Sequence, residues 1–211
     1  MKNKGMTITY EVDSGLYINV TNRCTNSCSF CIRQNGDGAY GSDSLWLLHE
    51  PSVSEILADV FSRDLDKYSE LVFCGYGEPT VRLHDIREVA LGIKKRYPSM
   101  KIRVNTNGHS DLIHGTDTSP LYKDAFDVVS ISLNTPDADK YVEMCHPVYQ
   151  KSAFNALLTF AENVNKYVQK TLLSVVRQTL TAEELEECRR IADSLGVALK
   201  VRDYISKDDS I

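Results

Sequence analysis

The sequence predicts an α/β fold in which six strand-helix units form a partial, TIM-like (βα)6 barrel that is open on one side. Short apolar runs typical of buried strands alternate with longer runs of helical periodicity, which indicates a parallel sheet with crossover helices. The six strand patterns are fewer than the eight of a closed barrel. With 211 residues, 42% of them hydrophobic, the chain is expected to form one domain over residues 1–211.

The predicted strands carry different side chains on their two faces. They cover residues 16–21, 71–74, 101–106, 128–133, 171–177 and 197–203. In four of them the residues of one parity are apolar and should face the helices, because successive side chains of a strand point to opposite sides. The polar parity would line the lumen of an open barrel. It comprises Asn19, Arg103, Asn105, Ser130, Ser132, Asn134, Lys200 and Arg202.

Helices are predicted from capping signals and apolar spacing. Ser52 with Glu55, and Thr181 with Glu184, have the spacing of a capping box, which marks a helix start. Further helices are expected over residues 86–97, after Asp137 and over residues 153–168, whereas residues 109–123 show no clear pattern.

The charge and hydropathy of the chain exclude some classes of function. The net charge is −5 and no long basic run occurs, which argues against a broad nucleic-acid-binding surface. No apolar run approaches the roughly 20 residues of a membrane span, and the first residues lead into no secretory segment. A cytoplasmic location is therefore expected.

Three cysteines follow the first predicted strand at CxxxCxxC spacing: Cys24, Cys28 and Cys31. Thiolates are the ligands of iron-sulfur clusters, and three of them can hold three irons of a 4Fe-4S cluster while the fourth iron stays open to a small molecule. The alternative is a structural zinc site, which needs a fourth ligand. Candidates for that ligand are His49, Cys74 and Cys145.

Together with the segment Cys74-Gly75-Tyr76-Gly77-Glu78-Pro79, this loop resembles the radical S-adenosylmethionine enzymes. The resemblance implies that the three cysteines bind a 4Fe-4S cluster and that S-adenosylmethionine is the second cofactor. Reductive cleavage of S-adenosylmethionine would then give a 5′-deoxyadenosyl radical, and this radical would abstract hydrogen from a substrate. The family has a glycine-glycine-glutamate-proline turn, and here Tyr76 displaces the first glycine of the pair.

The resemblance also implies which residues meet S-adenosylmethionine. Phe30 would lie near the adenine, and the turn of Gly75, Tyr76, Gly77 and Glu78 would receive the methionyl amino end. The polar residues at the ends of the third and fourth predicted strands would meet the carboxylate and the ribose. These are Asn105, Thr106, Ser132 and Asn134.

A narrower resemblance is to the small radical proteins associated with TatD-family hydrolases. It rests on residues 20–24 and 31–33, the loop 42–49 with its single Trp46, and residues 132–134. It implies a functional link to a TatD-family hydrolase, and the radical chemistry implies an electron donor such as flavodoxin or ferredoxin.

Residues facing the substrate are hypotheses. The catalytic candidates are Cys145, Arg177 and Arg103, and Trp46, Tyr76 and His146 could also face the substrate. The long connection 33–50 could close as a lid. A small polar or anionic metabolite is favoured over a peptide or protein substrate. The competing class is a protein-binding module in which zinc or an iron-sulfur cluster only staples a loop, without catalysis.

Overall fold

The computed structural model describes residues 5–204, in which seven strands form one sheet in the order β1-β2-β3-β4-β5-β6-β7. Strands β2 to β7 are parallel, and β1 pairs with β2 in antiparallel fashion. The strands are β1 Thr9–Val12, β2 Gly15–Ile18, β3 Glu70–Phe73, β4 Ile102–Thr106, β5 Val128–Ser132, β6 Lys170–Val176 and β7 Ala198–Arg202. The six parallel strands are those expected from the sequence, so the predicted α/β partial barrel is confirmed.

Strand β1 was not predicted. It forms a hairpin with β2 through a tight turn in which Asp13 has a positive φ of 52°. Aspartate tolerates this left-handed conformation better than most residues, and Gly15 follows at the start of β2. The hairpin adds an antiparallel edge to the parallel sheet.

Within the described part of the chain, six α-helices connect the strands. They are α1 Val53–Phe61, α2 Leu83–Arg96, α3 Ser110–His114, α4 Ala138–Cys145, α5 Ser152–Val164 and α6 Ala182–Ser194. Both predicted capping boxes are present, at Ser52 and Thr181, and Asp137 caps α4. The helix expected over residues 153–168 ends earlier, at Val164, and the unpatterned stretch after His109 contains the short α3. No helix within residues 5–204 is long and apolar enough to cross a membrane.

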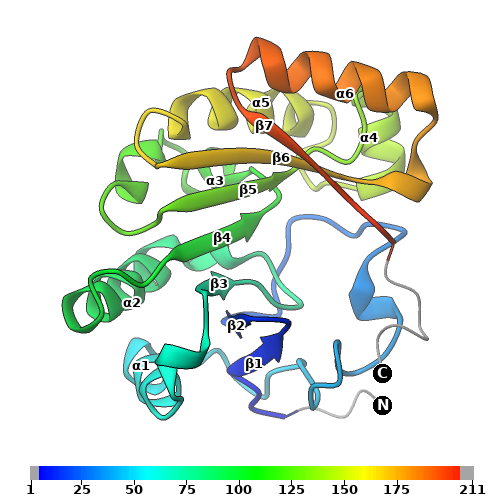
Figure 1. The fold of residues 1–211 in the computed structure, drawn as a ribbon. Helices are drawn as coiled ribbons and strands as arrows, with labels where there is room; N and C mark the ends of the chain where they lie inside the picture. Colours follow the sequence, from blue (N-terminus) through cyan, green and yellow to red (C-terminus); the bar gives the residue numbers. More distant parts are fainter. Residues whose placement is uncertain (1–4, 205–211) are drawn as a thin grey trace.

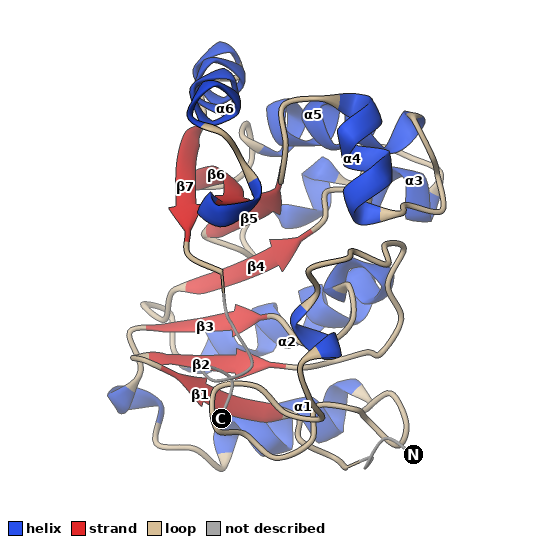
Figure 2. Cartoon of the chain, turned by 90° about the vertical axis from the view of Figure 1, so that its right-hand side faces the viewer, coloured by secondary structure: helices blue, strands red, loops and turns tan. Residues whose placement is uncertain are grey.

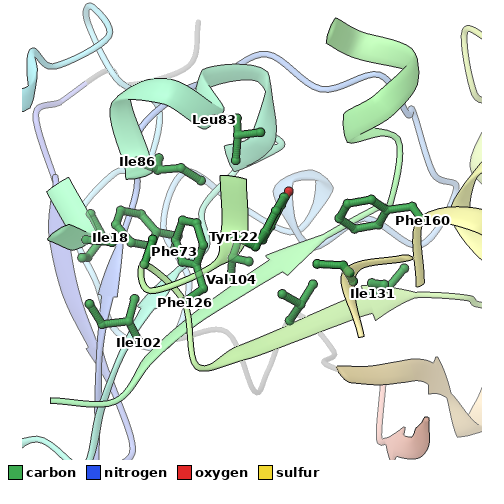
Figure 3. Close-up of a cluster of buried hydrophobic side chains, with 14 of the residues drawn as sticks. Ile18, Phe73, Leu83, Ile86, Ile102, Val104, Tyr122, Phe126, Ile131 and Phe160 are labelled. Atoms are coloured by element: carbon green, nitrogen blue, oxygen red, sulfur yellow. The ribbon is translucent and has the colours of Figure 1, made fainter. Parts of the chain in front are cut away.

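The apolar side chains on one face of the strands pack against the helices, as predicted. Helices α1, α2, α5 and α6 follow the outside of the curved sheet, while the connection after β2 crosses its other side (Figure 1). The seven strands lie side by side from β1 to β7 (Figure 2). Figure 3 shows the core between strands and helices. Ile18, Ile102, Val104 and Ile131 are fully buried there.

A second, smaller core anchors the connection 33–50. Trp46 packs edge-on against Tyr76 at a ring-centroid distance of 5.0 Å, and only 9% of Trp46 is exposed. The Tyr76 hydroxyl lies within hydrogen-bonding distance of the carbonyl oxygens of Gly36 and Gly38, at 3.0 and 2.7 Å. Trp46, which we expected to face the substrate, is thus part of the packing that holds this connection on the barrel.

Candidate active site at the carboxyl ends of the strands

The cysteine loop follows β2 and pairs with the end of α4. The backbone N–H of Ser27 donates to the carbonyl of Cys145, and that of Ser29 donates to the carbonyl of Met144, both at 2.9 Å. These bonds place Cys28 beside Cys145, 117 positions further along the chain. The loop is therefore fixed to the barrel by main-chain bonds on both sides of its central cysteine.

A buried network of hydrogen bonds holds the first part of the cysteine loop, at Thr25 and Asn26. Asn26 donates to the Tyr141 hydroxyl at 3.2 Å, and this hydroxyl lies 3.1 Å from Nε2 of His109. Nδ1 of His109 lies 3.2 Å from the Thr25 hydroxyl, to which the Asn107 amide donates at 2.8 Å. Because the Tyr141 oxygen accepts from Asn26, its proton is directed to Nε2, and Nδ1–H donates to Thr25. Our sequence interpretation missed His109, which lies in a stretch without a clear pattern.

This network predicts a loss of stability in acid. Burial lowers the pKa of His109 from 6.5 to about 4, so the native state binds fewer protons than the unfolded state between these values. The contribution of neutral His109 to the free energy of unfolding is fully present above pH 6.5. It decreases by roughly 3 kcal/mol in total as the pH falls toward 4. Denaturant titrations of wild type and His109→Gln at pH 7 and pH 4 measure this. His84→Gln, at an exposed histidine of α2, is the control for loss of an imidazole that is not buried.

Two of the motif thiols, Cys24 and Cys28, have different surroundings. Burial raises the pKa of the Cys24 thiol to about 12, and the carboxylate of Glu78 adds to this rise. A hydrogen bond with Cys145, followed by burial, raises the pKa of Cys28. Within residues 5–204, no three His, Cys, Asp or Glu side chains are grouped closely enough to hold a metal ion. The donor set fits a 4Fe-4S cluster by thiol chemistry and by its position on one loop, and binding requires the thiols to converge and lose their protons.

The turn after β3 lies directly against the cysteine loop. A side chain at Gly77 would overlap the carbonyl oxygen of Thr21 and lie 2.6 Å from that of Arg23. The next backbone N–H, that of Glu78, donates to the Arg23 carbonyl at 2.7 Å. At Gly75 a side chain would overlap the amide of Asn19. Both glycines are therefore required by close approach to the chain that leads into the cysteines.

Glu78 joins the ends of β3 and β4. It is 3% exposed, and one carboxylate oxygen accepts from the backbone N–H and the hydroxyl of Thr80, at 3.0 and 2.7 Å. The same oxygen accepts from the Thr106 hydroxyl at 2.7 Å, and the other oxygen accepts from the Asn107 N–H at 2.7 Å. Burial raises the pKa of Glu78, and these bonds oppose the rise by favouring the charged form.

The remaining predicted cofactor residues lie along the same rim. Asn105 and Ser132 end β4 and β5 on the lumen side, and Asn105 accepts from Arg103 at 3.0 Å. Asn134 has a positive φ of 65° and donates to the Cys145 sulfur at 3.3 Å. Phe30 is half-buried against the main core. The structure thus brings the ends of β2 to β5 and of α4 to one place.

The three catalytic candidates have different surroundings. Cys145 is fully buried beside the cysteine loop. Arg177 follows β6, has a side chain that is 60% exposed, and lies 3.7 Å from Asp203. Arg103 lies in the first half of β4, and its guanidinium makes two bonds to the carboxylate of Glu70, at 2.7 and 3.1 Å. Their catalytic roles stay predictions.

Solved structures show the same fold at low sequence identity. SuiB of Streptococcus suis bound to the precursor peptide SuiA has a TM-score of 0.64 and 18% identity, over 90% of this chain and 39% of that one. A radical SAM methyltransferase from Sphaerobacter thermophilus has a TM-score of 0.61 and 14% identity, over 96% and 71%. The enzyme anSMEcpe with AdoMet and the Cp18Cys peptide has a TM-score of 0.63 and 18% identity, over 89% and 50%.

The chain spans well under half the length of the SuiB protein. No curated protein sequence matched it. The model of the radical SAM superfamily matches residues 18–192, which include both the cysteine loop and the glycine turn. The chain therefore belongs to the radical SAM superfamily, a family of enzymes that use a 4Fe-4S cluster and S-adenosylmethionine.

Proposed function

We propose that this protein abstracts hydrogen from a small polar substrate bound in the lumen of the partial barrel. The single observation that carries the proposal is the shared rim, where the cysteine loop, the glycine turn and the end of β4 contact one another and β5 pairs alongside β4. The conserved chemistry of the family supports it: S-adenosylmethionine supplies a 5′-deoxyadenosyl radical when the cluster is reduced.

In this proposal the residues of the chain bind and orient the cofactors. Cys24, Cys28 and Cys31 hold the cluster. Gly75 and Gly77 allow the backbone of the β3 turn to approach the methionyl end, and Tyr76 anchors the neighbouring connection through Gly36 and Gly38. The other expected contacts with S-adenosylmethionine come from Phe30, Glu78, Asn105, Thr106, Ser132 and Asn134. Glu78 also holds the turn to the end of β4, because it accepts from the Thr106 hydroxyl and from the backbone N–H of Asn107.

Reductive cleavage of S-adenosylmethionine tests the proposal. Anaerobically reconstituted protein with a chemical reductant is expected to form 5′-deoxyadenosine slowly without substrate, as measured by chromatography. Protein without reductant is the control, since cleavage requires an electron. A protein that holds stoichiometric zinc and forms no 5′-deoxyadenosine would instead support a metal-stapled binding module. The match of the radical SAM superfamily model to residues 18–192 argues against that alternative.

A peptide substrate is the second candidate. Two of the similar structures, those of SuiB and anSMEcpe, are described with bound peptides. The charged lumen of this chain favours a small anionic substrate. An electron donor such as flavodoxin or ferredoxin follows from the radical chemistry, and the functional link to a TatD-family hydrolase stays a prediction.

A further inference from the structure

The lumen face of the sheet carries an excess of positive charge. Strand register places Lys200 beside Ser174, and Arg202 two residues further along the same face. The opposite parity of β7, Leu199 and Val201, packs against the core of the helix side. Both cations of β7 therefore lie on the side of the sheet that also carries Arg103.

Only one of these three cations has a carboxylate partner within residues 5–204. Glu70 lies 2.7 Å from Arg103 and neutralises it. In the same part of the chain, neither Lys200 nor Arg202 forms an ion pair. Arg202 instead lies 3.4 Å from the hydroxyl of Ser174, which is 1% exposed.

The electrostatic environment of Lys200 agrees with this excess. Burial first, and then the positive charges of Arg103 and Arg202, lower its pKa, and Lys170 acts in the same direction. Glu70 is the one described carboxylate that opposes them. Three cations against one anion leave a field that favours a bound anion.

The charge of Arg202 reaches across the lumen. It acts on the half-buried Cys74 thiol that follows β3, where desolvation raises the pKa and a hydrogen bond with Asn105 and the charges of Arg202 and Arg103 oppose the rise. It also acts on Tyr40 of the connection after β2. Lys200 and Arg202 are exposed on the edge strand β7, so an anion can reach both side chains, and the charge of Arg202 acts on groups of β3 and of the connection after β2.

We propose that Lys200 and Arg202, the latter oriented by the hydroxyl of Ser174, bind a phosphate or carboxylate group of the substrate. A guanidinium fork and a neighbouring ammonium match the oxygens of such anions, and the Ser174 hydroxyl, which accepts from Arg202, helps to fix the orientation of the guanidinium. That the bound anion is part of the substrate rests on the proposed function. The anion site itself needs no cluster. Arg103 is not part of the proposed site, because its guanidinium is already paired with Glu70.

Calorimetric titration of the apoprotein with inorganic phosphate, and separately with succinate, tests the anion site. One saturable site is expected, and the tighter anion identifies phosphate or carboxylate chemistry. Lys200→Gln and Arg202→Gln should each weaken binding by about tenfold or more, because each removes a charge-assisted contact. Lys95→Gln, at an exposed lysine of α2, changes the net charge equally and should bind as wild type.

Three results would overturn the proposal. They are the absence of saturable binding of both anions, equal weakening in Lys95→Gln, and displacement of the anion by S-adenosylmethionine in reconstituted protein. The last would assign the cations to the cofactor carboxylate. Because the first titration uses apoprotein, its outcome is independent of whether the cysteines load a cluster, and circular dichroism of each variant confirms that it is folded.

Discussion

Alanine at Cys24, Cys28 or Cys31 is expected to reduce the iron content of anaerobically reconstituted protein from about four per chain to near zero. Each thiolate would hold one iron, and the cluster has no replacement ligand on the same loop. The loop is fixed by its bonds to α4 and by the His109 network, so the backbone should survive the loss of one thiol. Iron and sulfide analysis, with the visible absorption of the cluster, measures the effect.

Two other cysteines serve as controls. Cys188→Ala, in the buried stripe of α6, should keep the iron content of wild type. Cys145→Ala is the sharper control, because Cys145 hydrogen-bonds to Cys28 and is also a candidate fourth ligand of a structural site. If Cys145→Ala loses metal as completely as the motif variants, or if stoichiometric zinc replaces iron, the open-iron assignment is wrong.

The parts of the fold that depend on local sequence could be predicted. Short apolar runs between helical patterns identified all six parallel strands, and the capping boxes at Ser52 and Thr181 gave the starts of α1 and α6. These signals need only neighbouring residues, because side-chain alternation and capping operate within one element. The location of the site followed from them, since the carboxyl ends of parallel strands meet at one rim.

Partners distant in sequence could not be predicted. Nothing near His109 in the chain indicates Thr25 and Tyr141 as its neighbours, and nothing near Arg103 indicates Glu70. Charge alone suggested that Arg103 could meet an anionic substrate. Its ion pair shows that the register of β3 and β4 decides which lumen cation remains available.

Trp46 illustrates a different limit. A single tryptophan in a long loop rich in glycine and serine suggested contact with a substrate. The structure uses it with Tyr76 as a small core, a tertiary contact that composition does not encode. Whether residues 33–50 close as a lid is a separate point, and it stays a prediction.

Glu78→Ala is expected to lower the free energy of unfolding by about 3–5 kcal/mol, because it leaves several buried donors without their acceptor. Thr80, Thr106 and Asn107 all donate to this carboxylate, and their burial denies them water. Glu78→Gln should cost less, since its amide oxygen can still accept from the threonines. Its amide N–H groups, however, would face the N–H of Asn107.

Denaturant unfolding of the apoprotein measures the structural part of this effect, with Glu88→Ala on the exposed side of α2 as the matched control. The functional part is measured on reconstituted Glu78→Gln at a temperature where it is folded. The turn that Glu78 holds also contacts Arg23 beside the cysteines, so binding of S-adenosylmethionine should weaken while the iron content stays near that of wild type. Unchanged affinity in a destabilised variant would show that Glu78 supports the fold alone. Weakened affinity at full iron content would show that the junction of β3 and β4 also positions the cofactor.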